Sequence, residues 1–376
     1  MKKRIFVLLL ALSLITLNTE AKDISSLVSP SAILVDGYTG KVLFEKNPDE
    51  KMPPASVTKI MTMLLVMEAI DRGEIGFEDI VTVSENAAKK EGSHIFLAVG
   101  EQMSVRDLLK GVAVASGNDA SIALGEYLSG SHEKFVEKMN QRASELGMTN
   151  THFVNCNGLD ADGHLTTARD IAKMTVELLK HPKIFEFTTI WMDTLRNGAF
   201  GLANTNKLIR FYDGANGMKT GSTSKAGCCI SATALRDGMQ LAAVIMGAPN
   251  SNERFSDAST LLNYGFGGFE NVVLGKSSET LKYIDVNKGI KKTVKVCLKN
   301  DFSAVLAKGK AKGITSAENL PEKIEAPVKK GEVVGKITFY DGQKPIGEVE
   351  ITANEDIERI DFSYSLKQLL LNFFSL

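Results

Sequence analysis

The sequence predicts a mixed α/β (α+β) fold: a central antiparallel sheet flanked by helices, then a small all-β domain and an amphipathic helix. Strand-like runs occur near the N-terminus and again before residue 250, with helical periodicity between them, so both ends of one domain contribute to its sheet. Helical periodicity fades after residue 270 and returns only at the C-terminus. The 376 residues also exceed the roughly 250–300 at which a single core stops growing, so two domains are expected.

The N-terminal segment, residues 1–21, has the pattern of a secretory signal peptide. Met1-Lys2-Lys3-Arg4 is followed by a largely apolar run, residues 5–17, and then by Thr19-Glu20-Ala21, which fits a small-residue cleavage site. The apolar run is too short to span a bilayer comfortably, and no later stretch approaches the ~18 apolar residues that a spanning helix needs. We therefore expect an exported, extracytoplasmic chain that begins near Lys22. An uncleaved N-terminal anchor is the alternative.

Composition excludes several classes of function. The net charge is −1, and nothing in the sequence indicates a nucleic-acid partner. The histidines and cysteines show no metal-ligand spacing, so we expect neither a metal nor a cofactor. A bridge between the adjacent cysteines would be strained, and structural thiols are the preferred interpretation of all four. These are Cys156, Cys228, Cys229 and Cys297.

The first domain, predicted for residues 22–270, begins with a hairpin. Its strands are Ile33-Leu34-Val35 and Val42-Leu43-Phe44, separated by a turn-rich stretch. After Pro53-Pro54, apolar residues at helical spacing predict a helix that Gly73 closes, with Ser56 in its first turn. Further helices are predicted over residues 105–115, 119–128, 135–146, 167–179 and 256–264, and a second antiparallel hairpin over 228–232 and 241–246.

The rest of the chain is predicted to form an all-β domain, residues 271–355, and a helix within residues 356–376. Strand-like runs occur over residues 294–298, 333–339 and 348–351. The tail has apolar residues at helical spacing, which is typical of an amphipathic helix. They are Phe362, Leu366, Leu369, Leu370, Phe373 and Phe374. This helix either lies in the plane of the cytoplasmic membrane at its outer face or packs on the β domain.

Three short motifs stand in order along the chain: Ser56-Val57-Thr58-Lys59, Ser116-Gly117-Asn118 and Lys219-Thr220-Gly221. Serine followed by lysine three positions later also occurs at Ser131 and Ser222, so the first motif alone is weak evidence. Context favours Ser56, which stands after a Pro-Pro break at a predicted helix start. Ser116 stands between two predicted helices, and Lys-[Ser/Thr]-Gly occurs once. Each residue could separately be a cap, a turn former or a solvated side chain; their joint order favours a catalytic site.

The chemistry of these residue types is consistent with a serine nucleophile. A hydroxyl needs a base, and on a helix Lys59 lies on the same face as Ser56. The lysine must be neutral to act as a base, which requires burial, a helix N-terminus or a second cation such as Lys219. Backbone N–H groups of Ser56 and Ser222 are candidates for binding an oxyanion. Gly221 leaves room for a substrate that adds itself to the strand edge.

At these positions the chain resembles the low-molecular-mass penicillin-binding proteins of the D-alanyl-D-alanine carboxypeptidase type, whose active sites carry such motifs. The resemblance covers nearly the whole chain, and includes residues 54–62, 115–120, 158–160, 167–170 and 216–221. It implies a β-lactamase/transpeptidase-like fold with the cleft between the sheet and an all-helical part. The implied roles are Ser56 nucleophile, Lys59 general base, Ser116 proton relay, Asn118 substrate-backbone contact, Lys219 electrostatic tuning, and Thr220 and Arg254 carboxylate binding.

The resemblance implies a DD-carboxypeptidase that removes the terminal D-alanine from peptidoglycan stem pentapeptides through an acyl-enzyme, and that β-lactams acylate. One alternative is a class A β-lactamase, which carries a glutamate that directs water for deacylation. No Glu-x-x-Leu-Asn occurs between Ser116 and Lys219, and the middle residue of the second motif is Gly117 instead of aspartate. A catalytically silent scaffold that binds peptidoglycan or division proteins is the other alternative.

Overall fold

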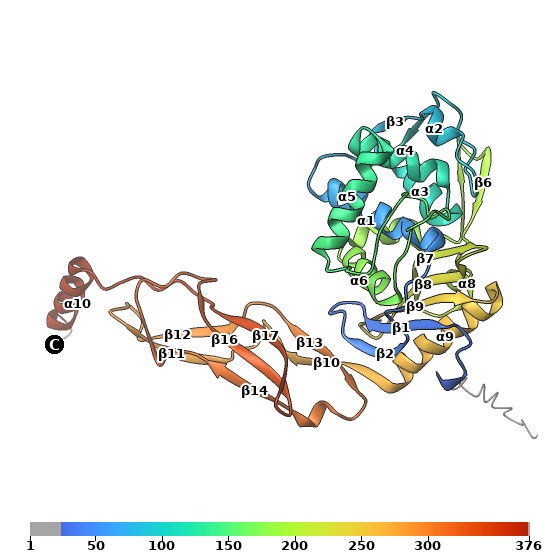
Figure 1. Cartoon of the computed structure of the whole chain (residues 1–376). Coiled ribbons are helices and arrows are strands. Elements are labelled where there is room, and N and C mark those ends of the chain that lie inside the picture. Colours follow the sequence, from blue (N-terminus) through green and yellow to red (C-terminus); the bar gives the residue numbers. More distant parts are fainter. Residues whose placement is uncertain (1–23, 375–376) are drawn as a thin grey trace, which may run out of the picture.

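The computed structural model describes residues 24–374 as a helix-rich body followed by an elongated β-rich body (Figure 1). The predicted signal peptide lies outside the described residues. The β-rich body extends away from the first one, and the C-terminal helix lies at its far end (Figure 1). Mixed helix and sheet in the first body, strands in the second and a terminal helix confirm the predicted fold class.

The main sheet of the first body has five antiparallel strands in the order β2-β1-β9-β8-β7. The N-terminal hairpin pairs with a strand that comes more than 200 residues later, as the sequence predicts, because β1 lies beside β9. The order leaves β7 at one edge of the sheet. The strands are β1 (Ser31–Asp36), β2 (Val42–Lys46), β7 (Ala215–Thr223), β8 (Gly227–Arg236) and β9 (Met239–Ala248).

Helices cover both faces of this sheet, which explains why β9 is apolar along most of its length. Ala242, Val244 and Met246 join the core that contains α6 (Ala168–Leu179). The alternate residues of β9, such as Ala243 and Ile245, join a second core with α9 (Ser251–Gly268). Successive side chains of a strand point to opposite faces, so a strand buried on both faces loses the apolar-polar alternation.

Most of the remaining helices form a helical part above the sheet, whereas the short α8 lies beside the sheet near α9 (Figure 1). Helix α1 is buried almost all round, which fits its central place in the body. Side-chain oxygens of Ser104, Ser131 and Thr167 cap three of the helices. The helices are α1 (Lys59–Asp71), α2 (Glu85–Ala88), α3 (Val105–Ala115), α4 (Asn118–Ser129), α5 (His132–Glu145), α7 (Phe185–Thr188) and α8 (Leu208–Phe211).

Short elements that the sequence analysis did not predict complete this body. Two small antiparallel strand pairs are formed by β3 (Ile80–Thr82) with β4 (Gln102–Ser104) and by β5 (Met192–Leu195) with β6 (Phe200–Ala203). There are also 3₁₀ turns, η1 (Ile24–Ser26), η2 (Ala55–Thr58) and η3 (Pro182–Ile184). Such short runs carry too little periodicity to be recognised without their tertiary contacts.

The β-rich body contains a six-stranded sheet, ordered β14-β16-β17-β12-β11-β15, and the pair β10-β13. Its own core gathers apolar residues from several of these strands, and Phe302 of β13 stacks on Phe339 of β16. The elements are β10 (Phe269–Gly275), β11 (Lys282–Asn287), β12 (Thr293–Leu298), β13 (Phe302–Ala307), η4 (Ala311–Gly313), β14 (Ile314–Asn319), β15 (Lys323–Glu325), β16 (Val333–Asp341) and β17 (Lys344–Ala353).

The C-terminal helix is α10 (Phe362–Phe374). Its exposed large apolar side chains are Phe362, Leu366, Leu369, Leu370, Leu371 and Phe373. Within residues 24–374, none of the helices combines the length and the apolar character needed to cross a membrane.

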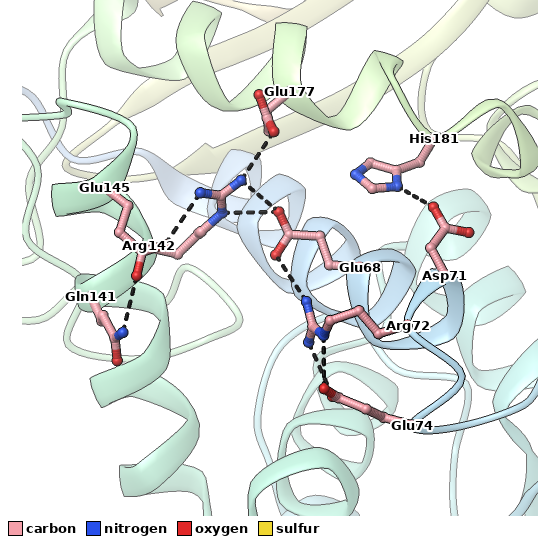
Figure 2. A network of polar contacts seen from close by, with 9 residues as sticks. All are labelled: Glu68, Asp71, Arg72, Glu74, Gln141, Arg142, Glu145, Glu177 and His181. Atoms are coloured by element: carbon pink, nitrogen blue, oxygen red, sulfur yellow. Dashed lines mark hydrogen bonds and ion pairs between the residues drawn. The ribbon is translucent and has the colours of Figure 1, made fainter. Parts of the chain in front are cut away.

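An ion-pair network links α1, α5 and α6 in the helical part (Figure 2). Arg142 of α5 donates to Glu68 of α1 and to Glu177 of α6, with N–O distances of 2.8 and 3.0 Å. The Glu68 carboxylate is only 11% exposed. Arg72, which is 54% exposed, pairs mainly with Glu74.

Replacing Arg142 with alanine should lower the free energy of unfolding by about 2 kcal/mol, because Glu68 is left partly buried without its main partner. Arg72→Ala removes a more exposed pair and should cost less than about 0.5 kcal/mol. Urea unfolding of both variants measures the difference. Equal losses would contradict the importance of the Arg142 network.

Candidate active site

Ser56 lies in the 3₁₀ turn η2, directly before α1 begins at Lys59. The sequence analysis predicted it in the first turn of the helix, and the structure places it one turn earlier. The preceding residue, Ala55, has a φ of 48°, in the left-handed region that alanine rarely adopts. Unusual backbone of this kind persists only where its surroundings hold it, and it clusters at functional sites.

Lys59 is fully buried, and its Nζ atom makes three contacts. It lies 3.0 Å from Ser56 Oγ, 2.6 Å from Asn118 Oδ1 and 2.6 Å from the carbonyl oxygen of Asn157. The amide and carbonyl oxygens can only accept hydrogen bonds. A neutral amine can therefore keep both of those bonds with its two N–H groups and present its lone pair to the Ser56 hydroxyl. This geometry suits a base.

The surroundings of Lys59 allow its amine to be uncharged near neutral pH. Burial lowers the pKa of Lys59 to about 7, although the nearby Cys156 and Asp119 act in the opposite direction. A base whose pKa is near the working pH is the efficient choice. From the sequence, a second cation was one of the expected causes of a lowered pKa at Lys59. In the structure burial is the main cause, and the repulsion between the two lysines acts on Lys219 instead.

Lys219 and Thr220 lie on β7, at the edge of the sheet. Lys219 is buried, and its Nζ donates to the Thr220 carbonyl at 2.8 Å. Burial, together with the cations of Lys59 and Arg254, lowers the pKa of Lys219 well below its usual range. The hydroxyl of Thr220 donates to Thr205 Oγ1 at 2.7 Å. Thr205 stands in a loop and was not predicted from the sequence.

The second motif lies at the junction of α3 and α4, as predicted. Ser116 is buried and ends α3 with a φ of 63°, so the chain turns sharply there. Asn118 begins α4, accepts from Lys59 through Oδ1 and donates through Nδ2 to the Glu91 carbonyl at 2.6 Å. Asn118 therefore links Lys59 to the loop that contains Glu91, between α2 and β4. No described contact joins the Ser116 hydroxyl to Lys59, so its relay role stays a prediction.

Two glycines press against the turn that carries Ser56. A Cβ atom at Gly158 would lie 1.9 Å from the Ala55 carbonyl oxygen, and one at Gly221 would lie 2.6 Å from the Ser56 nitrogen. Gly221 was predicted to leave the strand edge open, and the structure adds that β7 approaches the Ser56 backbone directly. From the sequence, Gly158 was singled out only through the resemblance over residues 158–160, and Asn157 was not singled out. Nothing in their local sequence indicates contact with Ala55 or Lys59.

Arg254 of α9 is almost completely buried behind β7. Its guanidinium donates to the carbonyls of Gly221 and Cys229 at 3.1 and 3.4 Å, and it packs over Phe255. In this arrangement Arg254 supports the strand that carries the third motif, whereas the resemblance assigns it a role with substrate. Ser222 is exposed at the same edge.

Within residues 24–374, no group of three or more histidine, cysteine, aspartate and glutamate side chains could hold a metal ion. The four cysteines are free thiols. A serine hydroxyl beside a buried, neutralisable lysine, at the free edge of an antiparallel sheet, defines an active-serine site for acyl transfer.

Comparison with known proteins agrees with this class. Residues 17–250 match the D-alanyl-D-alanine carboxypeptidase family of peptidases, and residues 269–359 match the C-terminal domain of penicillin-binding protein 5. The chain belongs to the D-alanyl-D-alanine carboxypeptidase family. This confirms the resemblance that the three motifs predicted.

Several relatives cover most of the chain. It is 40% identical over 382 aligned residues to D-alanyl-D-alanine carboxypeptidase DacF of Bacillus subtilis, covering 98% of each chain. The crystal structure of penicillin-binding protein 5 from Haemophilus influenzae has a TM-score of 0.74 at 32% identity, covering 89% of this chain and 98% of that one. Penicillin-binding protein D2 of Listeria monocytogenes, in its ampicillin-bound form, has a TM-score of 0.59 at 33% identity, covering 64% and 98%.

Proposed function

We propose that this protein is a serine D-alanyl-D-alanine carboxypeptidase, which removes the terminal D-alanine from peptidoglycan stem pentapeptides through an acyl-enzyme on Ser56. The observation that carries the proposal is the 3.0 Å contact between Lys59 Nζ and Ser56 Oγ, in surroundings that bring the pKa of Lys59 to about 7. Membership of the carboxypeptidase family supports the choice of substrate.

In the acylation step, neutral Lys59 takes the proton from the Ser56 hydroxyl as Oγ attacks the carbonyl carbon between the two D-alanines. The oxyanion that forms is held by the backbone N–H groups of Ser56 and Ser222. The C–N bond then breaks, and the leaving amine receives a proton that Ser116 relays from Lys59. Water hydrolyses the Ser56 ester, which releases the shortened peptide and restores the hydroxyl.

Substrate binding uses the free edge of β7. A peptide that adds itself beside this strand passes Gly221, which has no side chain to obstruct it. Asn118, on the opposite side, contacts the peptide backbone, and Lys219 tunes the electrostatics of the site. We assign the terminal carboxylate to the Thr220 hydroxyl, and we place Arg254 behind the strand in support, where it also adds positive charge.

β-Lactams are expected to acylate the same serine. The Listeria relative has been crystallised with ampicillin and with cefotaxime. The alternative of a β-lactamase makes a different prediction about the adduct. Purified protein should form a penicilloyl adduct that persists for many minutes while D-alanine release from a pentapeptide is blocked.

Intact-mass measurement over time after mixing with penicillin tests this prediction. Rapid loss of the adduct with steady production of penicilloic acid would favour the β-lactamase. No adduct, together with no D-alanine release, would favour a silent scaffold. D-alanine release measured alongside, with and without an acceptor amine, also shows whether transfer competes with hydrolysis.

We also propose the organisation that the sequence predicts: signal peptide 1–21, catalytic domain 22–270, β domain 271–355 and membrane-anchoring helix 356–376. Support for the anchor comes from the exposed apolar side chains of α10, which lies at the end of the β-rich body farthest from the active site (Figure 1). They include Phe362, Leu369 and Phe373, at 80, 69 and 73% exposure. An exposed apolar helix face is suited to lie in the membrane interface.

Removal of the helix tests the anchor. The full chain, expressed with its leader, should sediment with membranes after a high-salt wash, because apolar burial, not charge, would hold it there. A chain ending at Asp361, which keeps Ile357 in the core of the β-rich body, should be recovered in the soluble fraction with unchanged penicillin binding. Retention of the shortened chain on membranes would exclude the anchoring role.

A further inference from the structure

We propose that His164 is a positioning residue for acylation: through Thr58 it holds the Ala55 carbonyl, and thereby the turn that presents Ser56. The inference rests on the proposed function of Ser56 as nucleophile. His164 lies in the loop before α6, far from Ser56 in sequence, and is not part of the three motifs. It is buried, with 1% of its surface exposed.

A continuous chain of hydrogen bonds leads from His164 to Ala55. The backbone N–H of Val154 lies 2.9 Å from His164 Nδ1, and His164 Nε2 lies 2.9 Å from Thr58 Oγ1. The Thr58 hydroxyl in turn donates to the Ala55 carbonyl oxygen, also at 2.9 Å.

The donors and acceptors in this chain fix the tautomer of the histidine. The Val154 N–H can only donate, so Nδ1 accepts and carries no proton. The proton of the neutral ring is therefore on Nε2, which donates to Thr58 Oγ1 while that hydroxyl donates onward. Burial lowers the pKa of His164 to about 4. The ring is therefore neutral around neutral pH, and the hydrogen-bond chain is intact.

The hydrogen-bond chain ends at Ala55, where the backbone conformation needs support. Ala55 has a positive φ, and its carbonyl is the group that a side chain at Gly158 would strike. Without the bond from Thr58, Ala55 is free to relax toward an ordinary conformation. Such a relaxation would rotate the peptide that leads into Ser56 and displace Oγ from Lys59 Nζ. A displacement of ~1 Å at a reacting atom can cost a factor of 10² in rate.

Loss of the donor should therefore slow acylation without weakening the initial binding of the β-lactam. We expect His164→Leu to reduce the first-order acylation rate constant for penicillin about 10- to 100-fold. Its apparent dissociation constant should change less than about twofold, because the groups that contact the ligand remain. In the pH profile of the acylation rate, the fall at low pH should keep its midpoint near pH 7, because the substitution leaves Lys59 in place.

Conservative variants separate positioning from general damage to the fold. His164→Gln can still donate an N–H to Thr58 and should recover most of the rate. Thr58→Val, which keeps the shape but lacks the hydroxyl, should be as slow as His164→Leu, and the double variant no slower than either single one. His152→Leu, at an exposed histidine in the same region, is the matched control and should acylate normally. Thermal unfolding identifies any variant that does not fold.

Stopped-flow acylation of the full mature chain by a chromogenic cephalosporin, together with penicillin competition, gives the acylation rate constant and the apparent dissociation constant. Wild-type rates in His164→Leu and Thr58→Val would overturn the inference, and so would additive losses in the double variant. His164→Gln that folds but is as slow as His164→Leu would also overturn it. Failure of the wild-type protein to acylate would refute the proposed function instead, so the two failures are distinguishable.

Discussion

Replacing Lys59 with methionine should reduce the rate of Ser56 acylation by ~10³-fold, because the hydroxyl then has no base within reach. Methionine has nearly the same length, so it fills the buried space that Lys59 occupies. Lys59→Arg is the informative companion. It keeps a positive charge at the site but stays protonated at all relevant pH values, so it should be equally inactive. An active Lys59→Arg variant would contradict the role of Lys59 as a base.

The same account predicts how the wild-type rate depends on pH. Below a pH of about 7 Lys59 is protonated in the folded protein and cannot accept the serine proton. The acylation rate should therefore fall by about tenfold for each pH unit below that midpoint, and should level off above it. Stopped-flow acylation between pH 5 and 9 gives the profile. A rate independent of pH across this range would exclude a lysine with this pKa as the base.

Gly158→Ala should also slow the acylation of Ser56, by about 10²-fold, although the residue carries no functional group. The added methyl group would lie 1.9 Å from the Ala55 carbonyl oxygen, a backbone atom that cannot move aside alone. The Ser56 turn must shift, and a shift of about 1 Å costs ~10²-fold in rate. Gly158 also has a φ of 85°, which strains an alanine independently of the contact.

A second glycine in the same loop separates these two effects. Gly163 has a φ of 79°, and the closest neighbour of an added Cβ is His152 at 4.0 Å. Gly163→Ala should therefore carry the backbone strain without the collision. We expect it to lose stability but to acylate at close to the wild-type rate. If both alanine variants lost the same activity, backbone strain in the loop and not the contact with Ala55 would be the cause.

Much of the fold could be predicted because its signals are local. Helix α3 occupies Val105–Ala115, the predicted range, since it has helical spacing and a serine cap. β9 stood out as a run of apolar residues because both faces of the sheet are covered. The predicted helix start near Ser56 was close, but the 3₁₀ turn depends on contacts of Ala55 with distant residues.

The candidate site was predicted only where a motif carried the information. Ser56, Lys59 and Asn118 meet as the motif order implied. Asn157 contributes a backbone carbonyl, which any residue possesses, so its sequence gives no signal. Thr205 and His164 act through hydrogen bonds to motif residues across long sequence separations. Such partners follow from the packing of the chain and not from spacing along it.

Mapping the site of covalent penicillin binding distinguishes Ser56 from every other candidate nucleophile. Wild-type protein incubated with labelled penicillin should gain one adduct per chain, located on the peptide that contains Ser56, and Ser56→Ala should gain none and release no D-alanine from a pentapeptide. A label on Ser131 or Ser222, the other serines followed by lysine three positions later, or any adduct on the Ser56→Ala variant, would contradict the account.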